Sequence, residues 1–300
     1  MSDKSPRESI AAATGPAISV VRWMNALSID AVVVGVLWQT LFACSFRGSW
    51  PTIPESVTLG TTLWLIYTAD HLLDARSLDI DRMHTFRHLV HLRHRSALVA
   101  LWSFLTVCDA VAIITWLPDS LIRWGLGMAA AVLVYGAGVH FRPKTKIWLA
   151  KEFQVGILFA IGVGLLAWDH APSVSLLFAT MLCAVLFSAN CIIVAHFDRE
   201  ADREQQFSSI ATKQVAAVRY LPTVMAAVAT IAIAGAAVNA LPRLIACSIV
   251  ISSVMLAALA HASCIEASTT DATLANNRFN VRHGLADATL IAPILIGWLA

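Results

Sequence analysis

Nine apolar runs constrain the fold of this chain more than any other feature of its sequence. Several of them approach the ~20 residues that a helix needs to cross a bilayer, while the second, fifth and ninth are short. Hydrophobic residues make up 58% of the chain and charged residues only 13%, a balance that excludes an ordinary soluble domain. The pattern predicts an all-α polytopic membrane protein with nine transmembrane helices, over residues 29–46, 57–73, 97–117, 121–141, 153–168, 174–197, 221–240, 244–265 and 285–300.

The connections between the runs suggest how the chain is organised. We expect one transmembrane domain over residues 1–300, preceded by a cytoplasmic tail over residues 1–24. Two longer polar segments, 75–96 and 203–220, follow the second and sixth runs and are expected to cap the bundle. Basic and histidine residues recur at helical spacing in the first cap segment, which is typical of a short amphipathic helix on a membrane surface.

The distribution of basic residues predicts the orientation. With the amino terminus inside, the inner segments carry 18 of the 21 Lys and Arg residues, and only Arg47, Arg123 and Arg243 lie outside. Cytoplasmic loops of membrane proteins carry such an excess. The sequence therefore predicts an integral multi-pass protein, in the cell inner membrane, with its amino terminus and its active site facing the cytoplasm.

Soft metal ligands form no convincing pattern. The six cysteines are scattered, mostly within apolar runs, and none is paired as Cys-x-x-Cys, so we interpret them as small hydrophobic residues. His84, His88, His91 and His94 fall along one side of a helix without a supporting Cys or Glu. We interpret these histidines as a solvated interfacial face and not as a zinc site.

Two carboxylate pairs stand at the cytoplasmic ends of the second and sixth runs. Asp70 and Asp74 form one pair, and Asp198 and Asp202 form the other. Residues four apart share a helix face, and ionisable residues at membrane depth usually mark a polar cavity or an ion path. Carboxylates suit a hard cation such as Mg²⁺, bound together with substrate phosphates. The alternative is that these residues only cap helices at the level of the lipid headgroups.

Basic residues lie close to both pairs. Arg142, Lys146 and Lys151 precede the fifth run, and Arg203 follows the second pair. They are candidates to bind a diphosphate and to stabilise its charge as it leaves, with contacts to anionic lipid as the alternative. Asn190, inside the sixth run, is a further candidate for this site, and its alternative role is to pair with a neighbouring helix.

The two acidic motifs resemble those of the UbiA superfamily of intramembrane prenyltransferases. The motif from Asp198 to Asp202, Asp-Arg-Glu-Ala-Asp, is similar to the second motif of that family. Residues 135–164 are similar to its aromatic-and-lysine loop and the glycine-bearing helix that follows. The first motif departs from the family pattern, because Asp70 replaces the usual Asn and the third acid is displaced to Asp79.

The resemblance implies a helical bundle around a central cavity, with Mg²⁺ as the cofactor. The reaction that it implies is transfer of a prenyl group from an isoprenyl diphosphate to a hydrophobic acceptor. The metal-binding and catalytic residues would be Asp70, Asp74, Asp198 and Asp202. The expected partners are the two substrates and the lipid bilayer, with no nucleic acid and no protein partner.

Two other functions stay open at this stage. A terpene cyclase of the same superfamily would use the same carboxylates, and no acceptor-binding signature stands out in the sequence. A non-catalytic membrane transporter or binding protein could use the carboxylates for cation or proton coupling. Transporter sites tend to lie near the bilayer midplane in broken helices, whereas these pairs lie near one interface, which favours an enzyme.

Overall fold

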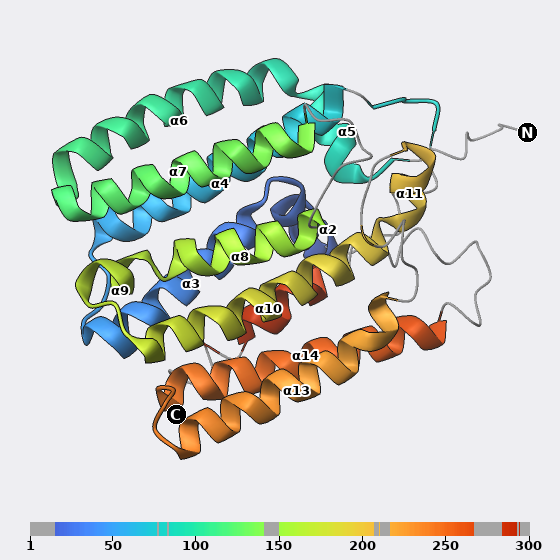
Figure 1. Ribbon diagram of the computed structural model, residues 1–300. Coiled ribbons are helices and arrows are strands. Elements are labelled where there is room, and N and C mark those ends of the chain that lie inside the picture. The colour runs from blue at the N-terminus through green and yellow to red at the C-terminus, as the bar shows by residue number, and fades with distance from the viewer. Residues whose placement is uncertain are drawn as a thin grey trace, which may run out of the picture.

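The computed structural model describes residues 16–76, 78–82, 84–140, 150–206, 210, 217–266, 284–292 and 294. Over these residues all regular secondary structure is helical, and no strand is present. The long helices run side by side in a bundle, from α6 at one edge to α13 and α14 at the other (Figure 1). The all-α prediction is therefore confirmed for the described part of the chain.

Thirteen helical elements with defined ends, and one further helical segment, make up the bundle. They are α2 (Pro16–Ala26), α3 (Ile29–Phe42), the π-helix η1 (Ala43–Arg47), α4 (Ile53–Arg76), α5 (Phe86–Arg93), α6 (Arg95–Trp116), α7 (Asp119–His140), α8 (Lys151–Val163), α9 (Leu165–His170), α10 (Val174–Phe197), α11 (Arg199–Glu204), α13 (Ala217–Ala237) and α14 (Arg243–Glu266), with a helical segment over residues 284–292.

Six stretches within these helices are long and apolar enough to cross a membrane, which supports a multi-pass membrane protein. They are Ile29–Arg47, Arg95–Trp116, Asp119–His140, Val174–Phe197, Ala217–Ala237 and Arg243–Cys264, and each coincides with a predicted run. Of the other three predicted spans, 285–300 lies partly outside the described residues, which include only 285–292 and 294 of it. Helix α4 has 24 residues but carries many polar side chains, and Gly164 separates α8 from α9. The count of nine spans stays a prediction.

The outer helices α6 and α7 expose apolar side chains along their length. Helix α7 has a single buried residue, Leu121, and Leu133, Val134 and Phe104 are mostly exposed. Trp116 and Trp124, at facing ends of α6 and α7, are also exposed, where an interfacial tryptophan belt would place them. These surfaces suit contact with lipid.

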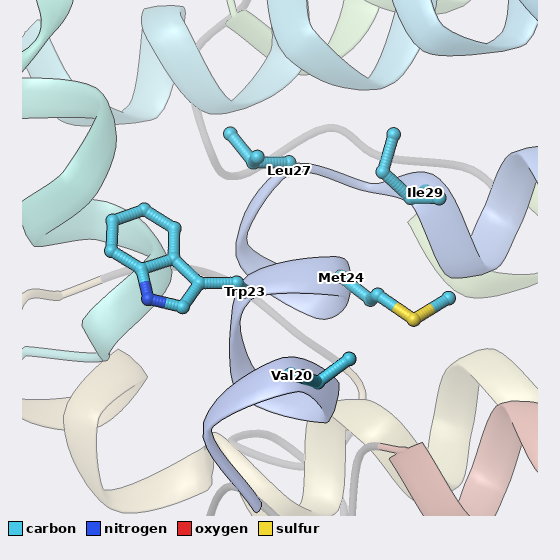
Figure 2. A pocket seen from close by; sticks show the side chains of 5 residues that line it. All are labelled: Val20, Trp23, Met24, Leu27 and Ile29. Carbon is cyan, nitrogen blue, oxygen red and sulfur yellow. The ribbon is translucent and has the colours of Figure 1, made fainter. Parts of the chain in front are cut away.

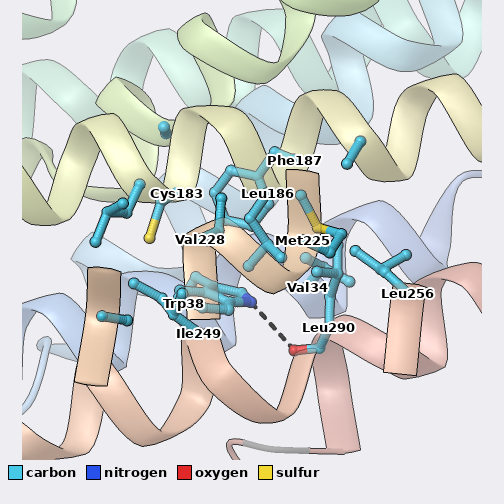
Figure 3. Packing of buried hydrophobic residues seen from close by; sticks show 14 of the residues in the cluster. Val34, Trp38, Cys183, Leu186, Phe187, Met225, Val228, Ile249, Leu256 and Leu290 are labelled. Atoms are coloured by element: carbon cyan, nitrogen blue, oxygen red, sulfur yellow. Dashed lines mark hydrogen bonds between the residues drawn. The ribbon is translucent and has the colours of Figure 1, made fainter. Parts of the chain in front are cut away.

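The core lies where α10 packs against α3, α13 and α14. Trp38 of α3 is fully buried and meets the ring of Phe187 edge to face, with 5.2 Å between centroids. Its Nε1 donates to the carbonyl oxygen of Leu290 at 3.1 Å, which fixes residues 284–292 against α3 (Figure 3).

Helices α8 and α10 approach each other very closely. A Cβ atom on Gly156 would collide with the backbone and side chain of Ser188. Only glycine fits this contact, which lets the two helices pack at backbone distance.

The two cap segments lie together at one end of the bundle, where α5 and α11 are seen in Figure 1. The predicted helix in residues 75–96 is confirmed as α5, and Thr85 caps it by accepting a hydrogen bond from the amide of His88 at 3.3 Å. The interpretation of its histidines as a solvated face is wrong for two of them. His88 and His91 are buried, because that side of α5 packs against α4.

Candidate functional site

The first carboxylate pair lies at the end of α4 and meets the end of α7. His140 Nε2 lies 2.9 Å from Asp70 Oδ1, and His140 Nδ1 lies 4.0 Å from Asp74 Oδ1. The imidazole is therefore within hydrogen-bond distance of Asp70 and within ion-pair range of Asp74. Both acids keep contact with open space, since their side chains are 37% and 26% exposed.

The second carboxylate pair lies where α10 passes into α11. The Asp202 amide donates to the Asp198 carbonyl at 2.8 Å, so the helical turn between the two acids is preserved. Both residues are buried, and Asp198 Oδ2 accepts a hydrogen bond from Arg87 Nη2 at 3.2 Å. Asp198 is thus paired with Arg87 of the first cap segment, which lies 111 positions away in the sequence.

Two cations connect the carboxylate pairs electrostatically. Burial alone would lower the pKa of Arg87, but the carboxylates of Asp198, Asp202 and Asp74 raise it above its ordinary value, so the guanidinium stays charged. Lys151, the first residue of α8, lies within electrostatic range of Asp202, Asp74 and Asp70. Acids of both motifs therefore act electrostatically on the same two basic side chains.

The two cap segments are also bonded directly to each other. Gln205 Nε2 donates to the carbonyl oxygen of Asp79 at 2.8 Å, and the Asp79 amide donates to Gln205 Oε1 at 3.0 Å. Arg82 Nη1 donates to the carbonyl oxygen of Glu204 at 2.9 Å. The Asp79 carboxylate, the displaced third acid of the first motif, forms an ion pair with Arg82 at 2.9 Å.

A group of histidines packs at the contact between α5 and α4. His91 and His71 meet edge to face at 5.1 Å between ring centroids, and His91 Nδ1 donates to the carbonyl oxygen of Arg87 at 3.0 Å. Burial and the charge of Arg87 lower the pKa of His88 to about 3, and burial also lowers the pKa of His91. Both α5 imidazoles are therefore neutral near pH 7, and they hold the backbone that carries Arg87.

The predicted diphosphate-binding residues are found in different places. Arg142 and Lys146 lie outside the described residues. Burial opposes the charge of Lys151, but the carboxylates of Asp202, Asp74 and Asp70 raise its pKa above the ordinary value. Arg203 is exposed on α11. Asn190 is buried and donates to Asp287 at 3.1 Å, so its predicted alternative, pairing with a neighbouring helix, is realised.

Two residues at the centre of the site were not among the predicted site residues. Arg87 is one of the basic residues that recur at helical spacing in the first cap segment, and His140 lies 70 positions from the carboxylate that it contacts. The available signal was charge: each acidic pair needs cations nearby, and Arg87 and His140 are polar residues on segments adjoining the acidic end.

The donor chemistry of the carboxylates fits Mg²⁺, which prefers oxygen ligands and binds through one or two carboxylates plus phosphates. Within the described ranges, no three His, Cys, Asp or Glu side chains are grouped so that they could hold a metal ion together. Asp70 and Asp198 each already contact a basic side chain. Metal binding there would require those two contacts to be shared or exchanged.

Apolar surface lies beside the charged end. A depression of about 260 Å³ on α2 and the start of α3 is lined by Val20, Trp23, Met24, Leu27 and Ile29 (Figure 2). Trp23 packs edge to face on Phe86 of α5, with 5.2 Å between centroids. Charged groups and apolar surface adjoin at this end of the bundle, as an amphiphilic ligand requires.

No protein-family model, no curated protein and no solved structure matches this chain. The residues of the site and their arrangement are therefore the basis for the function proposed below.

Proposed function

We propose that this protein is a Mg²⁺-dependent intramembrane prenyltransferase of the UbiA type. One observation carries the proposal: Arg87 forms an ion pair with Asp198, and the carboxylates of both motifs act electrostatically on Arg87 and Lys151 at one end of an apolar bundle. Carboxylates bind a divalent cation, and guanidinium and ammonium groups bind phosphate oxygens. A site that alternates these charges suits a diphosphate accompanied by a metal ion.

The proposed metal ligands are the four carboxylates, Asp70, Asp74, Asp198 and Asp202. When bound, Mg²⁺ would neutralise charge on the diphosphate and so favour its departure. Arg87 and Lys151 would bind the same leaving group, and we retain Arg142, Lys146 and Arg203 as predicted contributors. The transferred group is then an isoprenyl chain, for which the apolar interior provides a dry environment.

Placing the site in the membrane follows from the same features. The six apolar stretches support a multi-pass protein. We propose that the acidic end faces the cytoplasm of the cell inner membrane, because the basic residues concentrate on that side of the predicted spans.

The proposal is tested by measuring diphosphate release from farnesyl diphosphate, using the full chain in lipid membranes with added Mg²⁺. We expect Asp74→Asn and Asp202→Asn to reduce the release rate by about 100-fold or more, since electrostatic stabilisation of a leaving group has that magnitude. Asp109→Asn is the matched control. Asp109 is also a buried acid, but it bonds to Thr62 away from the site, and its variant should keep the wild-type rate.

Undiminished release in both site variants would refute the assignment of the carboxylates. Mass spectrometry of the lipid extract identifies the product and so separates a transferase from a cyclase. A prenylated acceptor supports the proposal, whereas a terpene hydrocarbon formed without any acceptor would point to cyclisation.

A further inference from the structure

A second polar pair lies deeper in the bundle than the carboxylate motifs. Asn190 lies in α10, eight residues before Asp198 at the end of that helix. At ~1.5 Å per residue, this separation is about 12 Å along the helix axis. Its Nδ2 donates to Asp287 Oδ1 at 3.1 Å, and Asp287 belongs to the helical segment 284–292. The pair therefore lies inward of the proposed diphosphate site.

One atom of this pair has no hydrogen-bonding partner among the described residues. Asn190 is only 8% exposed, and its Oδ1 atom is buried without a donor. The orientation of the amide is set by chemistry, because only its NH₂ group can donate to the carboxylate. An unsatisfied buried carbonyl oxygen costs roughly as much as a lost hydrogen bond, and at membrane depth water is scarce. A ligand with a donor group would remove that cost.

The segment that carries Asp287 is held in place on both sides of that residue. Towards its start, Gly284 packs against Val21 of α2 so closely that a side chain would collide there. Further on, the carbonyl oxygen of Leu290 accepts from Trp38 (Figure 3). Asp287 is therefore a positioned group and not part of a loose end.

The Thr62–Asp109 pair shows what simple helix pairing looks like in the same protein. Thr62 Oγ1 donates to Asp109 Oδ2 at 2.8 Å between α4 and α6. Within the described part of the chain, neither side chain retains a buried polar atom without a partner. The unsatisfied oxygen distinguishes Asn190 from this pair.

We propose that Asn190 and Asp287 bind the hydroxyl group of the hydrophobic acceptor. Both offer acceptor oxygens, so the ligand must donate, and a neutral hydroxyl enters an apolar bundle at far lower cost than an ammonium group. The term acceptor rests on the proposed function, whereas binding of a hydroxyl-bearing amphiphile does not. A polar anchor at this depth also favours a transferase over a cyclase, whose substrate extends only its isoprenoid chain inward from the diphosphate.

The test compares two probes that differ in one hydrogen-bond donor. Binding of 4-octylphenol and of its methyl ether, 4-octylanisole, to the full chain in detergent is measured by calorimetry. We expect wild type to bind the phenol at least about tenfold more tightly than the ether, which is what one hydrogen bond to a charged group provides. Asp287→Asn should weaken phenol binding by about the same factor, and Asp109→Asn should leave it unchanged.

Asn190→Leu provides an independent variant if Asp287→Asn does not fold, and it should also lose the preference for the phenol. Equal binding of both probes to wild type, or wild-type phenol binding in the variants, would overturn the proposal. Because calorimetry needs no turnover, this failure is distinguishable from failure of the proposed function, which is measured as diphosphate release.

Discussion

The two carboxylate pairs have the same spacing but opposite surroundings. The first pair is open, with Asp70 37% exposed and within hydrogen-bond distance of the imidazole of His140. In the second pair, the Asp198 side chain is only 5% exposed and is bound to the guanidinium of Arg87. A buried carboxylate needs a permanent counter-charge, whereas an exposed one can exchange its partner. The comparison indicates that the second pair organises the site and the first pair admits ligands.

The largest expected effect comes from removing Asp198. Asp198→Asn leaves the Arg87 guanidinium without its carboxylate in a buried position, which costs about 3–5 kcal/mol. Asp70→Asn, the equivalent change in the open pair, should cost less than about 1 kcal/mol. Thermal unfolding in detergent measures both variants, and equal destabilisation would remove the distinction between the pairs.

The double variant Arg87→Met/Asp198→Asn sharpens the same comparison. Because both members of the ion pair are replaced, Arg87 is no longer left beside a neutralised partner, and we expect recovery of about 2 kcal/mol relative to Asp198→Asn alone. A double-mutant cycle in thermal unfolding measures this coupling. If the stability losses of the two single substitutions simply add in the double variant, the 3.2 Å contact between Arg87 and Asp198 contributes nothing to stability.

The packing of α5 against α4 should become less stable in acid. The pKa of His88 in the folded protein is about 3, below the ordinary value of about 6.5, so the unfolded state takes up the proton first. The contribution of neutral His88 to the free energy of unfolding is therefore complete above about pH 6.5 and is lost as the pH is lowered towards 3. At pH 5.5 the loss is about 1.4 kcal/mol.

Hydrogen exchange of residues 86–93 at pH 7.5 and 5.5 measures this loss. His88→Gln, which cannot be protonated, serves as the control and should show a smaller dependence on pH. If His88→Gln keeps the full dependence of hydrogen exchange on pH, the effect comes from titratable groups other than His88.

The smallest predicted effect concerns the bond between the caps. Gln205→Leu removes the two hydrogen bonds to the backbone of Asp79, which should cost about 1 kcal/mol and act locally. Hydrogen exchange should accelerate in residues 78–82 and 199–206, while the melting temperature stays nearly constant. Uniform acceleration through the bundle would contradict a local role.

Hydropathy and spacing predicted much of this arrangement. The six spans follow from the length of apolar runs, whereas the assignment of Asp70 and Asp198 to one site, based on their shared four-residue spacing, stays a prediction. The partners of these acids could not be predicted in the same way. Arg87 and His140 reach their carboxylates across long sequence separations, and only packing of α5 and α7 brings them there.

Burial was the other property that sequence alone did not provide. A histidine-rich, basic segment such as residues 84–95 has the composition of a solvated helix, yet His88 and His91 are covered by α4. Asp287 lies in the last predicted span, but its pairing with Asn190 depends on how that segment docks against α10.

The contact between Gly156 and Ser188 has a mechanical consequence. There is no room for even a methyl group between them, so α8 cannot slide along α10 unless the two helices first separate. Lys151 begins α8 and Asp198 ends α10, so this single backbone contact limits how far the two charged residues can shift independently.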